Sequence, residues 1–81
     1  MDLTVNQQLA LQAAREHRDL VRLPGGLWTA PGVPKDEQGI PEWHFTTTTI
    51  KALIRRQVVH ITEQVSRREP VKVRIAPVWA D

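Results

Sequence analysis

Residues 45–59 read FTTTTIKALIRRQVV, and this stretch carries the clearest structural pattern of the chain. Between Thr47 and Gln57 the apolar side chains recur with the period of an α-helix, which predicts a short amphipathic helix. Several threonines stand at its start, where a side-chain hydroxyl can cap the first turn. The predicted apolar face comprises Ile50, Leu53, Ile54 and Gln57. Polar and basic residues cover the rest of the helix, which runs directly into an expected β-strand.

A β-hairpin is predicted after this helix. Its strands are expected at Val58–Gln64 and Val71–Val78, and the turn between them contains Arg67 and Arg68. In the second strand, apolar residues at 71, 73 and 75 alternate with basic residues at 72 and 74. This alternation predicts a strand with one buried face and one basic, solvent-facing face. Pro77 predicts that the strand ends, or lies at a sheet edge, near its C-terminus.

An N-terminal helix is predicted from about Thr4 to Arg18. The residues Thr4-Val5-Asn6-Gln7 fit a capping box, in which the Thr side chain and the Gln side chain each bind the other's backbone amide. This helix has one predicted apolar stripe, which consists of a series with four-residue spacing, Val5, Leu9, Ala13 and His17, together with Ala10 and Ala14 beside it. Because the stripe is narrow and its side chains are small, we expect the helix to pack on a sheet.

A short hairpin and a long loop are predicted between the two helices. Pro24-Gly25-Gly26 is a turn signal between apolar runs at Leu20–Leu23 and Leu27–Thr29. Prolines and glycines break any regular element from Ala30 to Trp43, and Trp43 and Phe45 are expected to pin this loop to the core. The predicted fold class is therefore α+β, a single domain of residues 1–81. Two helices pack on a small antiparallel sheet of three or four strands.

The composition is that of an ordinary globular protein, with 41% apolar and 25% charged residues. There is no cysteine, which excludes disulfides and Cys-based zinc sites and favours a reducing cytoplasm. The stretch from Met1 to Ala14 lacks the continuous apolar run of a signal peptide, and no run is long enough to span a bilayer. We therefore expect a cytoplasmic protein with no membrane partner.

Charge is unevenly distributed along the chain. Residues 1–44 carry a net charge of −2 and residues 45–81 a net charge of +4. Such asymmetry indicates that the C-terminal half faces a polyanion or an acidic partner, although a solvated surface with no partner remains an alternative.

The basic residues of this half are candidates for nucleic-acid binding. Arginine reads guanine edges or phosphates, and threonine near a helix N-terminus contacts phosphate. We expect phosphate contacts from the hydroxyl and charged side chains of the helix and of the turn, and base contacts from Arg55 or Arg56. The candidate residues are Thr48, Thr49, Lys51, Arg55, Arg56, Arg67 and Arg68. The alternative interpretation is an amphipathic helix with a solvated polar face, followed by a charged hairpin tip that maintains solubility.

The pattern Thr-x-x-Ile-x-x-Leu-Ile-Arg-Arg-Gln-Val-Val, from Thr47 to Val59, resembles the recognition helix and first wing strand of winged-helix DNA-binding domains. The resemblance implies a winged-helix-like topology that binds double-stranded DNA, in a protein of regulatory or phage-derived type. Gln57 stands where that family has glycine, which predicts a less sharp turn from helix to strand. The family also has a supporting helix before the recognition helix, where this chain has its Pro/Gly-rich loop. The segment Gly26-Leu27-Trp28-Thr29 is similar to small uncharacterised bacterial and prophage proteins.

No catalytic or cofactor motif is present. The histidines at 17, 44 and 60 match no metal-ligand spacing, and Pro24-Gly25-Gly26 matches no phosphate-binding loop. We therefore expect no enzyme activity, cofactor or metal. The alternative function is a protein-interaction module or homodimer that acts through the edge of the C-terminal strand and Trp79. Trp28 and Trp43 are expected in the core, although the three tryptophans together could also form a stacking platform.

Overall fold

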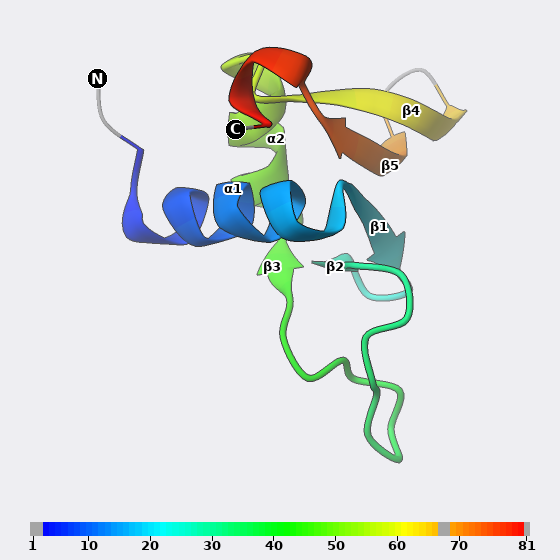
Figure 1. The fold of residues 1–81 in the computed structure, drawn as a ribbon. Helices are drawn as coiled ribbons and strands as arrows, with labels where there is room; N and C mark the ends of the chain where they lie inside the picture. The colour runs from blue at the N-terminus through cyan, green and yellow to red at the C-terminus, as the bar shows by residue number, and fades with distance from the viewer. Residues whose placement is uncertain (1–2, 67–68, 81) are drawn as a thin grey trace.

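The computed structural model describes residues 3–66 and 69–80, which form two helices and a five-stranded antiparallel sheet (Figure 1). The α+β class is as predicted. The elements in chain order are α1 (Val5–His17), β1 (Asp19–Leu23), β2 (Leu27–Thr29), β3 (Phe45–Thr46), α2 (Thr47–Arg55), β4 (Val59–Ser66), β5 (Glu69–Ile75) and a 3-10 helix (Pro77–Trp79).

The sheet has the strand order β3-β2-β1-β5-β4. It contains more strands than predicted because Phe45 and Thr46 pair with β2 before α2 begins. The prediction that the C-terminal strand offers a free edge is wrong, since β5 pairs with β1 on one side and with β4 on the other. The two edges are instead the two-residue strand β3 and the eight-residue strand β4.

The last strand is shorter than predicted. It ends at Ile75, and Pro77 begins a turn of 3-10 helix at the place where the strand was expected to continue. Pro70 lies within β5 opposite Gln64, and the register of β5 with β4 shifts on both sides of this pair. On its other side, the pairing of β5 with β1 stops at Val21 and Lys72. Proline has no backbone N–H to donate, so it is tolerated in a strand at a position where one side has no neighbouring strand to accept that hydrogen bond.

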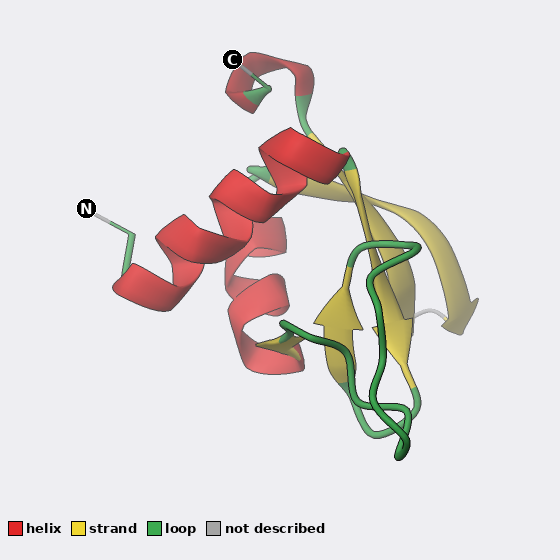
Figure 2. Ribbon diagram, turned by 60° about the horizontal axis from the view of Figure 1, so that its bottom comes forward, coloured by secondary structure: helices red, strands yellow, loops and turns green. Residues whose placement is uncertain are grey.

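Both helices cover the same side of the sheet, and the core lies between them and the strands (Figure 2). Cross-strand partners Leu20 and Val73 are fully buried on this side, as is Trp28. Ile50 and Leu53 of α2 complete the centre of the core. Both residues belong to the predicted apolar face, as does the partly buried Ile54. Gln57, which was assigned to the same face, is exposed and lies beyond the end of α2.

The buried face of α1 coincides only in part with the predicted stripe, because its two flanking alanines are buried and its larger aliphatic residues are not. Ala10, Leu11 and Ala14 are buried, whereas Leu9 is 50% exposed and Val5 is 72% exposed. Alanines at the contact allow α1 to approach α2 and the sheet closely, and the larger side chains of the stripe are turned aside. The capping box at its start is as predicted, because Thr4 and Gln7 each accept a hydrogen bond from the other's backbone N–H at 3.2 Å.

The loop between β2 and β3 is irregular, as predicted, but it is internally bonded. The Asp36 carboxylate accepts hydrogen bonds from the backbone N–H groups of Gln38 and Ile40 at 2.8 and 2.9 Å. At its end the Trp43 ring lies 5.4 Å from the ring of His17 and 5.8 Å from that of Phe45, centroid to centroid. Trp43 and Phe45 also pack on the core, so they pin the loop as predicted.

The turn from α2 into β4 is sharp, contrary to the prediction from Gln57. Gln57 has a φ of 61°, the left-handed conformation that glycine most often supplies at the end of a helix. Its N–H donates to the Ile54 carbonyl and the Val58 N–H donates to the Leu53 carbonyl, both at 3.0 Å. These two bonds form a Schellman motif, and the burial of Val58 and Leu53 holds Gln57 in place.

We predict that Gln57→Gly will stabilise the protein by about 0.5–1 kcal/mol. A left-handed conformation costs a side chain about 1–2 kcal/mol, and the greater freedom of glycine in the unfolded chain offsets part of this gain. Urea denaturation will measure the effect. The matched control is Gln12→Gly on the exposed side of α1, which should instead destabilise the protein by about 1 kcal/mol. Equal destabilisation by both changes would contradict the prediction.

A salt bridge joins the neighbouring strands β1 and β5. The Arg74 guanidinium donates to both carboxylate oxygens of Asp19, through Nε at 2.9 Å and Nη2 at 3.3 Å. These hydrogen bonds, with the nearby positive charge, lower the pKa of Asp19 below its ordinary value.

Because the pKa of Asp19 is lower in the folded state, its contribution to the free energy of unfolding should depend on pH. Because its folded-state pKa is the lower one, the carboxylate stabilises the fold above its unfolded pKa of about 3.9, and the contribution disappears as pH falls through the folded value. Asp19→Asn should therefore lower Tm at about pH 7 and make no difference at about pH 2. Glu37→Gln at the loop tip is the control. A Tm difference for Asp19→Asn that persists unchanged at the lower pH would refute this account.

Candidate nucleic-acid interface

The four consecutive threonines at the start of α2 have different roles in the structure. Thr46 is the N-cap, and its hydroxyl accepts a hydrogen bond from the Thr49 N–H at 3.4 Å. The Thr47 hydroxyl accepts from Trp28 Nε1–H and donates to the Gly26 carbonyl, both at 3.1 Å. These contacts serve the fold, since they begin the helix and satisfy the polar atom of a buried tryptophan.

Thr48, Lys51 and Arg55 form one exposed face of α2. Their spacing of three and four residues places them within about 60° of one another around the helix axis. The buried Ile50 and Leu53 lie on the opposite side. We call Thr48, Lys51 and Arg55 the basic face of α2.

The other predicted site residues lie elsewhere. Thr49 is half-buried on the side of α2 that faces α1, about 130° from the basic face, and its hydroxyl lies 3.2 Å from that of Thr46. Arg56 is the half-buried C-cap residue of α2, and its N–H donates to the Ala52 carbonyl at 3.2 Å. Arg67 and Arg68 fall outside the described residues. The structure thus brings three of the seven predicted residues onto one accessible helix face.

The β4–β5 hairpin extends from the end of α2 as a long arm beside the body of the domain (Figure 1). From His60 to Ser66 every residue of β4 is exposed, although Val59 at its start is buried in the core. Helix and hairpin therefore follow one another in the order expected of a recognition helix and wing. The described part of β4 carries a single acidic residue, Glu63, whose partner across the ladder is Lys72.

The supporting helix of a helix-turn-helix motif is not found between β2 and α2 in the described part of the chain. Strand β3 enters α2 directly, and α1 is the helix that packs against α2. The structure therefore establishes an α+β domain, and the winged-helix comparison concerns only α2 and the hairpin after it.

A second set of basic residues was not among the predicted site residues. A hollow of about 440 Å³ near the end of α1 is lined by Arg15, Arg18 and Arg74. Two of them have internal partners, because Arg15 Nε donates to the Trp79 carbonyl at 2.6 Å and Arg74 binds Asp19. The hydrogen bond from Arg15 holds the backbone of Trp79 beside α1. The Trp79 side chain packs against the core, whereas the alternative function required it at an interface.

A second and larger hollow is a groove beside α1 that the sequence pattern did not reveal. It has a volume of about 580 Å³ and lies between α1, the end of the long loop and the start of α2. The lining residues are Asn6, Leu9, Gln12, Ala13, Glu16, His17, Trp43, His44, Phe45, Thr46 and Thr49. A signal for it was present in the four-residue stripe of α1, but that stripe was assigned to the core.

Comparison of the chain with protein-family models, curated proteins and solved structures gave no match. Within the described residues, no three His, Cys, Asp or Glu side chains are grouped as metal ligands would be. At 13 and 9 residues, α1 and α2 are both too short to cross a membrane. The functional argument therefore depends on the chemistry of the surfaces alone.

Proposed function

We propose that this chain is a non-enzymatic, cytoplasmic domain that binds double-stranded DNA through the basic face of α2 and the adjoining hairpin. The observation that carries the proposal is the exposure of Thr48, Lys51 and Arg55 on one side of a helix whose opposite side is buried. A hydroxyl and two long cationic side chains on one helix face suit phosphate and base-edge contacts in a groove. The hairpin would add phosphate contacts beside the helix, as wings do.

The alternative of a protein-interaction module at the C-terminal strand loses its original basis. That strand is internal to the sheet, and Trp79 packs on the core with its carbonyl bound by Arg15. A partner protein is considered below on a different surface.

Fluorescence-anisotropy titration of labelled random duplex DNA at about 50 and 200 mM salt tests the proposal. With about four to six phosphate contacts, we expect affinity to fall by roughly 100-fold or more between these concentrations. The absence of binding at the lower salt concentration, with protein up to roughly 100 μM, would contradict the DNA proposal.

A further inference from the structure

The four-residue series on α1, Val5, Leu9, Ala13 and His17, is only partly covered in the described structure. Ala13 packs against the core and His17 contacts Trp43, but the two larger aliphatic side chains stay exposed. The core mainly uses the neighbouring face of the helix. Leu9 is half exposed, and Val5 is 72% exposed. Three members of the series, Leu9, Ala13 and His17, line the groove of about 580 Å³. An apolar stripe that faces a hollow marks an interaction site more often than an isolated surface leucine does.

The opposite wall of the groove is aromatic and held in place. The Trp43 ring contacts the rings of His17 and Phe45 in tilted arrangements, at 5.4 and 5.8 Å between ring centroids. Both aromatic residues also pack on the core. A wall that is already ordered loses little side-chain entropy on binding, which favours recognition.

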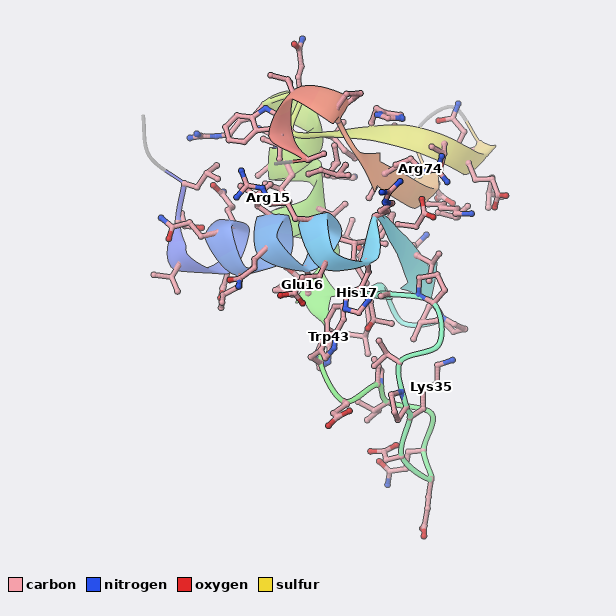
Figure 3. All side chains as sticks on the ribbon, in the orientation of Figure 1. Arg15, Glu16, His17, Lys35, Trp43 and Arg74 are labelled. Carbon is pink, nitrogen blue, oxygen red and sulfur yellow. The ribbon has the colours of Figure 1, made fainter. Side chains whose placement is uncertain are left out.

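The charge of the groove is negative. Glu16 is the one formally charged side chain among the described lining residues, which include neither Lys nor Arg. Glu42, exposed in the loop, immediately precedes Trp43. Glu16, His17 and Trp43 lie together on one side of α1, whereas Arg15 and Arg74 lie on the other side (Figure 3). The carboxylate and the aromatic rings both attract a cation, the rings through their electron-rich faces.

We infer that the groove docks a segment of a partner protein in which apolar side chains stand next to Lys or Arg. The lining of α1 extends from Asn6 to His17, about 16 Å along the helix, which matches about five residues of extended peptide. The apolar side chains cover Leu9 and Ala13 against Trp43, and the cationic group lies beside Glu16.

This inference is independent of DNA binding. Thr49 faces the groove from α2, whereas Thr48, Lys51 and Arg55 lie on a different side of the same helix. The domain can therefore hold a partner segment and a polyanion at the same time.

Amide NMR titration with three blocked hexapeptides tests the inference. The probes are acetyl-Ala-Lys-Leu-Leu-Lys-Ala-amide, its Glu-for-Lys counterpart and its Ala-for-Leu counterpart. We expect the first peptide to shift the amides of Leu9, Ala13 and His17 and the Trp43 indole N–H, with saturation. The other two should bind at least about tenfold more weakly, since one lacks the cations and the other lacks the apolar side chains.

Two variants sharpen the test without disturbing the core. Glu16→Gln should remove most of the preference for the Lys peptide over the Glu peptide, and Leu9→Ser should weaken both. Gln8→Ser, at an exposed position of α1 that is not in the groove lining, is the matched control and should change neither affinity. No shift by the first peptide at about 5 mM, binding of either of the other two peptides to the wild-type protein as tight as that of the first, or shifts confined to the basic face of α2 would each overturn the inference.

Discussion

Replacement of Trp28 by alanine should destabilise the protein by about 3–5 kcal/mol, the largest effect we expect from one substitution. Trp28 is fully buried and is the largest such side chain in the core. The change removes its packing area, leaves a cavity beside both helices and deprives the Thr47 hydroxyl of its donor. A domain of this size has a total stability of roughly 4–12 kcal/mol, so the variant will be partly or wholly unfolded.

Circular dichroism with urea denaturation will measure this loss. Trp28→Phe is the informative companion, because it keeps a ring in the core but lacks the N–H that donates to Thr47. It should lose about 1–3 kcal/mol, less than the alanine variant. Trp79→Ala, at a partly exposed position, is the control for removal of an indole. A loss below about 1 kcal/mol for Trp28→Ala would contradict the packing described for the core.

Reversal of the two charges on the basic face of α2 should reduce affinity for duplex DNA by about 100-fold. Lys51→Glu and Arg55→Glu each remove one contact with DNA and place a like charge near phosphate, and each is expected to cost about 1–3 kcal/mol. The fold should be unaffected, because both side chains are exposed on the side of α2 opposite its buried residues. The slope of log affinity against log salt concentration should decrease by the amount expected for about two phosphate contacts. This change distinguishes lost phosphate contacts from a damaged protein.

The matched control for this experiment is Lys35→Glu. Lys35 lies in the long loop, far from α2 in the view of Figure 3, and its reversal changes the net charge by the same amount as Lys51→Glu. Lys35→Glu should lower affinity by less than about threefold. If Lys35→Glu weakens binding as much as Lys51→Glu does, the interaction depends on net charge and α2 is not the contact surface.

Local signals in the sequence were sufficient to predict most elements. The capping box at Thr4 and Gln7, the turn at Pro24-Gly25-Gly26 and the period of Ile50 and Leu53 all act between neighbouring residues, and the structure forms each of them as predicted. The conformation of Gln57 was not predicted, because a left-handed glutamine is unfavourable by itself. It is held by the two hydrogen bonds at the end of α2 and by the burial of Leu53 and Val58, which depends on the tertiary fold.

The candidate site was predicted only in part, because some of its features are local and others depend on the tertiary fold. The exposed positions of Thr48, Lys51 and Arg55 follow from helix periodicity once the buried face is known. Periodicity could not separate the roles of the threonines, since the involvement of Thr47 with Trp28 joins residues that are 19 positions apart. Nor could it reveal the groove, which requires α1, Trp43 and the start of α2 to meet.

The sequence by itself determined that this protein is a small α+β domain with two amphipathic helices, two hairpins, a Pro/Gly-rich loop and a basic C-terminal half. These properties depend on composition and on interactions between near neighbours in the chain. Only the tertiary structure decided that β5 is internal and that β4 is an edge. It also decided that Ala10 and Ala14 of α1 face the core while Leu9 faces a groove. Those outcomes depend on long-range pairing and on how closely two surfaces can approach, and a one-dimensional pattern contains neither quantity.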